Sequence, residues 1–200
     1  MKAFRRYTTA ALIGLIVGLL TLVGQKYLPM NLNFLANSGA VWLIPAFLLS
    51  FFGKGDRPRA ILTAIICLLG CVYGYYISEA ILNRHAFSLS GGTLLWSSVA
   101  IPAGAVFGLG AYLANNSRNL LKYCGMNLLP AVFAAEGIEN LLHFADYAHM
   151  IPAVIMKIVI GVVLYFSINR KESAGAKNIL SFVGMTALGV IAYTLLYSLV

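Results

Sequence analysis

Residues 130–150 read P-A-V-F-A-A-E-G-I-E-N-L-L-H-F-A-D-Y-A-H-M, and this stretch predicts how the chain folds. It is apolar enough to lie in a bilayer, yet it carries five ionisable residues: Glu136, Glu139, His143, Asp146 and His149. On a helix that turns by about 100° per residue, the first four fall within a stripe roughly 80° wide. Ionisable groups inside a membrane helix are costly, by about 2.5–3.5 kcal/mol each on insertion scales, so they face a cavity or a partner. The stretch therefore predicts a membrane helix with a functional polar face.

Composition extends this interpretation to the whole chain. The 200 residues are 60% hydrophobic and 10% charged, whereas soluble domains have about 25% charged residues. Long apolar runs recur throughout, which predicts an all-α, polytopic membrane helix bundle that forms a single transmembrane domain over residues 1–200. The net charge of +8 comes from short basic clusters between apolar runs. Such clusters are typical of loops that orient a protein in the membrane, and they do not indicate nucleic-acid binding.

The apolar runs predict seven transmembrane helices. They cover residues 8–24, 38–52, 60–82, 91–114, 123–150, 151–168 and 179–200. The second contains Pro45 and is short for a bilayer, so it either starts near residue 32 or enters through a partly unwound or re-entrant segment. Small residues at four-residue spacing predict close helix contacts, at Ala10, Gly14 and Gly18, at Gly70 and Gly74, and at Gly104 and Gly108.

The basic residues predict the orientation. An amino terminus inside the cell places 11 of the 14 basic residues on the cytoplasmic side: Lys2, Arg5, Arg6, Lys54, Arg57, Arg59, Arg118, Lys122, Arg170, Lys171 and Lys177. Lys26 and Arg84 then lie outside, and Lys157 lies in the membrane. This split predicts a cytoplasmic amino terminus and an external carboxyl terminus.

In this orientation the fifth helix runs outward and the sixth returns inward. With a rise of 1.5 Å per residue, Lys157 falls close to the depth of Glu139. Neighbouring helices with a short connection are antiparallel. We therefore expect an ion pair between Glu139 and Lys157, with Glu136 as the alternative partner.

Further polar and aromatic residues collect in the outer half. We expect an outward-opening pocket between the second, third, fifth and sixth helices, where acids and aromatic faces suit a cationic or amine-bearing solute. Its candidate ligand-binding residues are Glu136, Glu139, Lys157, His143, Asp146, Glu79, Asn37, Trp42, Tyr75 and Tyr76. Four alternatives stay open: a structural network of Glu136, Glu139 and Lys157; ordinary interfacial positions for His143, Asp146 and His149; an aromatic belt; and capping of the second helix by Asn37 and Ser38.

Catalysis has little support. The sequence contains no H-E-x-x-H, G-x-S-x-G, Walker or Rossmann pattern, so we assign no catalytic residue and no cofactor. His143 and Asp146, with Glu139, could chelate a metal, but the spacing is weak and we assign no metal site. Cys67, Cys71 and Cys124 are interpreted as packing residues.

Four stretches carry a resemblance that covers nearly the whole chain. They are L-A-N-S-G-A-V-W at residues 35–42, Gly74-Tyr75-Tyr76 followed by Glu79, Pro102-x-Gly104-x-x-x-Gly108, and Glu136-Gly137-Ile138. They resemble a bacterial integral-membrane family of unknown function. The resemblance implies an inner-membrane protein and no particular activity. Size and helix number are also similar to those of the substrate-binding subunits of energy-coupling-factor transporters, which have six helices as a rule.

We therefore expect a multi-pass protein of the bacterial inner membrane that binds or transports a small, cationic or amine-bearing solute. Its partners would be the lipid bilayer, the solute, and a second copy or another membrane subunit. The alternatives are a non-catalytic accessory or assembly protein and, less favoured, a metal-dependent membrane hydrolase. An enzyme is the less favoured class.

Overall fold

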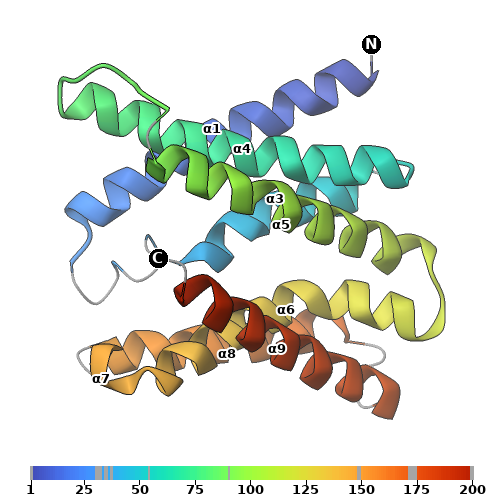
Figure 1. Cartoon of the computed structure of the whole chain (residues 1–200). Helices are drawn as coiled ribbons and strands as arrows, with labels where there is room; N and C mark the ends of the chain where they lie inside the picture. The colour runs from blue at the N-terminus through green and yellow to red at the C-terminus, as the bar shows by residue number, and fades with distance from the viewer. Residues whose placement is uncertain are drawn as a thin grey trace. The chain divides into compact units, whose positions relative to one another are not determined.

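The computed structural model describes residues 2–29, 33, 36, 38–53, 55–89, 91–147, 150–170 and 175–198, and this part of the chain consists of helices and the short segments that connect them (Figure 1). Its elements are α1 (Lys2–Tyr27), α3 (Gly39–Phe52), α4 (Arg57–Leu82), α5 (Gly91–Asn116), α6 (Asn119–Leu142), α7 (Phe144–Tyr147), α8 (Ile151–Ile168) and α9 (Ala176–Tyr197). The prediction of an all-α fold is confirmed. Predicted and observed boundaries differ by a few residues at most ends, as is usual for helix termini.

Five of these helices are long and apolar enough to cross a membrane: α1, α4, α5, α8 and α9. Two other predicted spans differ from them. Helix α3 has only 14 residues, and α6 has 24 residues but carries Lys122, Glu136 and Glu139. The outward faces of α8 and α9 are apolar, since both helices expose large hydrophobic side chains: Val159, Val163 and Phe166 on α8, and Leu180, Leu188 and Leu195 on α9. Such faces require a lipid bilayer as their solvent.

The chain divides into two compact units, Met1–Tyr112 and Leu113–Val200. Helix α5 begins in the first unit, and its last turn from Leu113 belongs to the second. The units are called unit 1 and unit 2 below. The single domain over residues 1–200 stays a prediction.

In unit 1, α1 and α4 meet through glycines. A Cβ added to Gly18 would overlap the backbone of Cys71 and lie 2.9 Å from the carbonyl carbon of Gly74, and one added to Gly14 would lie 2.9 Å from the Cα of Gly70. Residue numbers rise together along both helices, so α1 and α4 run parallel. The predicted close contacts of these small-residue stripes are confirmed, because only residues without side chains allow two backbones to approach this closely.

The other two helices of unit 1 run antiparallel to α4. Cβ atoms added to Gly104 and Gly108 of α5 would lie 2.6 Å from the Cα atoms of Ile65 and Ile61, which confirms the third small-residue contact. Along α3, Trp42 lies 6.4 Å from Tyr75 between ring centroids, and further on the Ser50 hydroxyl donates to the Ala60 carbonyl oxygen at 2.9 Å, so the numbering of α4 falls as that of α3 rises.

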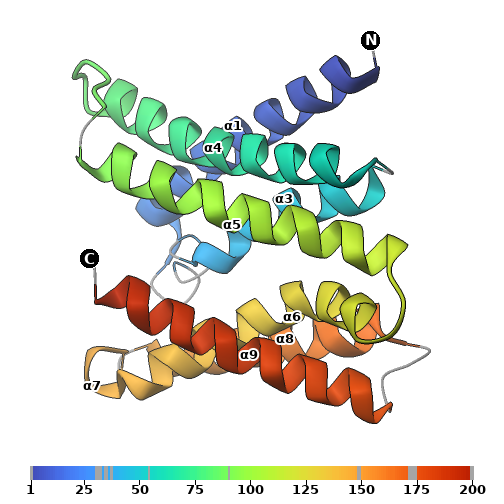
Figure 2. The same ribbon diagram turned by 45° about the vertical axis from the view of Figure 1, so that its right-hand side comes forward.

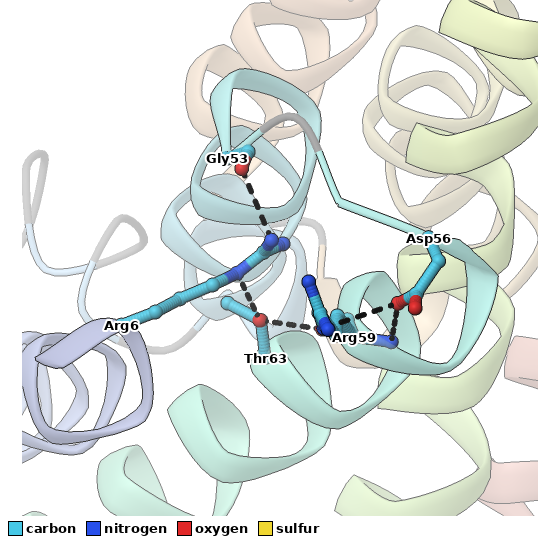
Figure 3. A network of polar contacts seen from close by, with 5 residues as sticks. All are labelled: Arg6, Gly53, Asp56, Arg59 and Thr63. Carbon is cyan, nitrogen blue, oxygen red and sulfur yellow. Dashed lines mark hydrogen bonds and ion pairs between the residues drawn. The ribbon is translucent and has the colours of Figure 1, made fainter. Parts of the chain in front are cut away.

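A polar network joins the start of α1 to the connection between α3 and α4 (Figure 3). Arg6 donates from Nε to Thr63 Oγ1 at 2.6 Å and from a terminal nitrogen to the Gly53 carbonyl oxygen at 3.1 Å. Asp56 caps α4 by accepting from the Arg59 backbone N–H at 3.1 Å. A capping aspartate followed by proline in the first turn explains why α4 begins here.

In unit 2, α6 contacts both α8 and α9 (Figure 2). Small residues again bring the backbones together. A Cβ on Gly137 would lie 2.5 Å from the Ile158 side chain, and one on Gly161 would lie 2.7 Å from the Ala134 nitrogen. The numbering falls along α8 as it rises along α6, so these helices are antiparallel.

Three buried asparagines join the helices of unit 2 at one end. Asn127 on α6 donates to Asn178 Oδ1 on α9 at 2.8 Å, and Asn169 at the end of α8 donates to Asn127 Oδ1 at 2.9 Å. At most 1% of each residue is exposed. Because Asn127 contacts Asn178 here and Glu136 contacts Tyr193 further along, α6 and α9 run parallel.

Candidate functional site

The ionisable residues of α6 form a cluster inside unit 2. The acid cluster consists of Glu136, Glu139, Asn140 and His143 from the end of α6, together with Lys157 from α8. Glu136, Glu139 and Lys157 are 5%, 3% and 7% exposed. The five side chains converge because Gly137 lets α8 approach this turn of α6.

Lys157 is held by two acceptors on α6. Its Nζ donates to Glu136 Oε1 at 2.9 Å and to Asn140 Oδ1 at 2.9 Å. The expected ion pair with Glu139 is therefore wrong, and the alternative partner is the observed one. The reason lies in the register: Gly137 faces Ile158, which brings Lys157 to the face of α6 that carries Glu136 and Asn140.

Glu139 contacts a different partner. Its Oε1 lies 2.8 Å from His143 Nδ1, and Asn140 Nδ2 donates to its Oε2 at 3.3 Å. The side chain of His143 is 28% exposed, whereas that of Glu139 is 4% exposed. Glu139 is therefore a buried carboxylate covered by a single half-buried imidazole.

The helix ends directly after this pair. Both the backbone N–H and the Nδ1 of His143 lie 3.2 Å from the Glu139 carbonyl oxygen, and His143 leaves the helical conformation with a ψ of 42°. The expected continuous helix over 123–150 is wrong here, since α6 ends at Leu142 and Asp146 lies in the separate helix α7. The Asp146 side chain and His149 lie outside the described part.

The acid cluster has unequal charges. Two carboxylates, Glu136 and Glu139, lie beside one ammonium group, that of Lys157. Lys157 pairs with Glu136, so Glu139 is the second carboxyl side chain of the cluster, and its neighbours are His143 and Asn140. The arrangement can therefore accept one positive charge at Glu139.

Two tyrosines of α9 complete the surroundings, and sequence reasoning missed both. The Tyr193 hydroxyl lies 3.5 Å from Glu136 Oε2, a long contact, and the Tyr197 ring lies 4.3 Å from the His143 ring between centroids. Asn140 was also missed, although its position four residues after Glu136 on the polar stripe could have indicated it. The tyrosines had no such signal, because their contacts depend on the parallel packing of α9 against α6.

Three of the other predicted site residues lie together in unit 1. Trp42 lies 6.4 Å from Tyr75 and 6.5 Å from Trp96 between ring centroids, and Tyr75 lies 5.1 Å from Tyr76. Trp42 Nε1 donates to Thr21 Oγ1 at 2.8 Å, and the Tyr75 hydroxyl donates to Gln25 Oε1 at 2.7 Å. The aromatic residues expected to form pocket walls are thus neighbours, and two of their polar atoms bind α1.

Glu79 and Asn37 have different outcomes. Glu79 accepts from Asn83 Nδ2 at 3.0 Å and lies 3.8 Å from His85 Nε2 near the end of α4. Asn37 lies outside the described residues. Unit 1 therefore holds Trp42, Tyr75, Tyr76 and Glu79, while the acid cluster belongs to unit 2.

No metal site is found among the side chains that the structure describes. Within them, no group of three His, Cys, Asp or Glu residues is arranged to hold an ion. His143 and Glu139 are close, but the third expected ligand, Asp146, has no described side chain. Cys67 and Cys71 are buried free thiols in α4, which agrees with their interpretation as packing residues.

Helix length, apolar outer faces and buried ion pairs together define the class: this is a multi-pass helical membrane protein. A family model matches residues 1–199, and the chain belongs to that family, the family of unknown function DUF6518. The resemblance to a family of unknown function is thereby confirmed. No curated protein and no solved structure matches the chain, so the similarity to energy-coupling-factor subunits stays a prediction.

Proposed function

We propose that this protein binds, and carries across the membrane, a small cationic or amine-bearing solute whose positive charge is received by Glu139. The observation that carries the proposal is the charge imbalance of the acid cluster, with two buried carboxylates beside one buried ammonium. A buried charge without a partner costs several kcal/mol, so a site with a surplus carboxylate favours a cation.

The two carboxylates have different roles in this proposal. Glu136 is neutralised by Lys157 at 2.9 Å and serves to hold α6 against α8. Glu139 carries the surplus charge, and the half-buried His143 lies between it and the surface. A solute cation would displace the imidazole of His143 and pair with Glu139 instead.

The relative directions of the helices support the expected membrane topology. α4 runs parallel to α1 and antiparallel to α3 and α5, while α9 runs parallel to α6 and antiparallel to α8. Alternating directions are expected if all seven helices, including α3 and α6, traverse the bilayer. With the positive-inside bias, we propose an internal amino terminus and an external carboxyl terminus in a bacterial inner membrane.

A reporter fusion tests the topology. Alkaline phosphatase, which is active only outside the cytoplasm, should be active when it is fused after Val200 and inactive when it is fused after Asn116 at the end of α5. The reverse pattern would overturn the orientation.

Binding by purified protein tests the function. Isothermal titration with methylamine, spermidine and choline should find at least one ligand for the wild type, and Glu139→Gln should weaken that ligand at least tenfold while the thermal unfolding temperature changes little. Asp56→Asn is the matched control, because it makes the same chemical change at an exposed cap. Equal binding by wild type and Glu139→Gln would show that the site is misplaced.

A second candidate, an accessory protein that binds another membrane protein, is favoured by one observation. Both carboxylates have partners inside the cluster, Lys157 for Glu136 and His143 for Glu139, which suits a purely structural network. On this alternative none of the three amines would bind, and the protein would co-purify with a membrane partner.

A further inference from the structure

A second feature of unit 2 lies away from the acid cluster. α6 and α9 form an open groove of about 720 Å³. Its lining residues are Asn119, Leu120, Cys124, Lys177, Leu180, Ser181, Gly184, Met185 and Leu188. Leu120, Leu180 and Leu188 are 54%, 69% and 62% exposed, so apolar side chains with little cover flank the groove. Among these described lining residues, Lys177 carries the charge.

Gly184 explains why the groove is open. A Cβ added there would meet no atom within 4 Å, in contrast to the glycines at the contacts of α6 with α8. One turn earlier, Ser181 Oγ lies 3.5 Å from Cys124 Sγ, where the two helices touch. The groove therefore has a closed floor at Ser181 and an unfilled space beside Gly184.

One end of the groove is positive. Asn119 and Lys177 lie in the first turns of α6 and α9, and these helices run parallel, so both amino termini point the same way. Neither first turn holds an acidic residue, and neither amino-terminal cap makes a side-chain hydrogen bond. The positive ends of the two helix dipoles therefore add to the charge of Lys177.

We propose that this groove binds an anionic phospholipid, with its phosphate at Lys177 and one acyl chain along Gly184. Charge complementarity selects the headgroup, because the positive charge lies at one end of an otherwise apolar surface. The chemistry is opposite to that of the acid cluster, which lies toward the other end of α6, so this site does not depend on the proposed solute. In the proposed orientation, the positive end faces the cytoplasmic leaflet, which is rich in anionic lipids.

Cys124 provides a local reporter, because it lines the groove while Cys67 and Cys71 are buried in α4. Full-length protein in neutral detergent is alkylated with N-ethylmaleimide, with and without added phosphatidylglycerol or phosphatidylcholine. Phosphatidylglycerol should slow alkylation of Cys124 at about a fivefold lower concentration than phosphatidylcholine. This ratio of concentrations corresponds to the ~1 kcal/mol by which one basic residue near the surface attracts anionic lipid.

Two pairs of variants separate headgroup from chain recognition. Lys177→Gln should remove the preference for phosphatidylglycerol, whereas Arg170→Gln, an exposed charge at the same end of the unit but outside the groove, should retain it. Gly184→Phe should fill the groove and abolish retention of one phosphatidylglycerol in native mass spectra, and Gly184→Ala should retain it.

Three results would overturn the proposal. The first is an unchanged lipid preference in Lys177→Gln, and the second is equal loss of preference in Arg170→Gln. The third is a wild-type dimer that Gly184→Phe converts to a monomer, since a second copy would then occupy the groove. Thermal unfolding of each variant identifies any that fails to fold. If Gly184→Phe does not fold, Lys177→Gln, at an exposed position, still decides the test.

Discussion

Removal of the charge on Lys157 provides the most direct test of the acid cluster. Lys157→Met keeps most of the side-chain volume but leaves Glu136 and Glu139 buried together without an ammonium group. Lys157 Nζ makes two bonds of 2.9 Å, to Glu136 and to Asn140, and the side chains of the ion pair are 9% and 7% exposed. Solvent therefore screens this ion pair only weakly, and the stability lost in Lys157→Met should match that of other buried ion pairs from which one partner is removed.

Breaking such a pair from one side destabilises a protein by about 3–5 kcal/mol, because the remaining charge stays buried. Removing both charges is much less harmful, since well-packed neutral groups of similar size avoid that desolvation. We therefore expect Lys157→Met to lower the free energy of unfolding by about 3–5 kcal/mol. The double variant Glu136→Gln with Lys157→Met should be more stable than Lys157→Met alone.

Equilibrium unfolding in detergent, followed by circular dichroism, measures the stability of the wild type, of Glu136→Gln, of Lys157→Met and of the double variant. These four proteins form a double-mutant cycle. A coupling energy of about 2 kcal/mol or more between the two sites is expected, as contacting residues couple by about 0.5–3 kcal/mol. Additive effects would refute the reasoning, and so would a loss of less than ~1 kcal/mol in Lys157→Met. Either result would mean that water or another cation already compensates Glu136.

The remaining predictions concern helix packing. Gly18→Leu should destabilise the protein by about 1–3 kcal/mol or more in the same unfolding assay, because its Cβ would overlap the backbone of Cys71. The control Gly184→Ala has open space around its Cβ and should change stability by less than ~1 kcal/mol. Asn127→Ala should cost about 1–3 kcal/mol, since it removes the buried hydrogen bonds of Asn127 with Asn178 and Asn169, whereas exposed Asn116→Ala should be nearly neutral. Equal losses in the two members of either pair would contradict the packing described.

Much of the fold was predictable from local patterns. Apolar runs placed most helix ends to within a few residues, with the end of α6 at Leu142 as the main exception. Four-residue spacing of small residues identified the contact between α1 and α4 at Gly14, Gly18, Gly70 and Gly74. Both signals are local, because they depend on periodicity within a single helix. The same reasoning brought Glu136, Glu139 and Lys157 together, since a short connection makes α6 and α8 neighbours.

The errors concern features that depend on two helices at once. The partner of Lys157 differs from the expected one by one helical turn, because the register between α6 and α8, where Gly137 faces Ile158, is a property of neither helix alone. Tyr193 was not anticipated, since nothing in the sequence states that α9 packs parallel to α6.

The amino-acid sequence by itself determined that this chain is an all-helical, multi-pass membrane protein with charged groups on its fifth long apolar segment. Hydrophobic length and the placement of charge are properties of each segment alone, and the bilayer acts on each segment separately. Tertiary structure alone decided that Lys157 neutralises Glu136 and leaves Glu139 beside His143. That choice depends on the register between α6 and α8, which close backbone contacts at Gly137 and Gly161 determine.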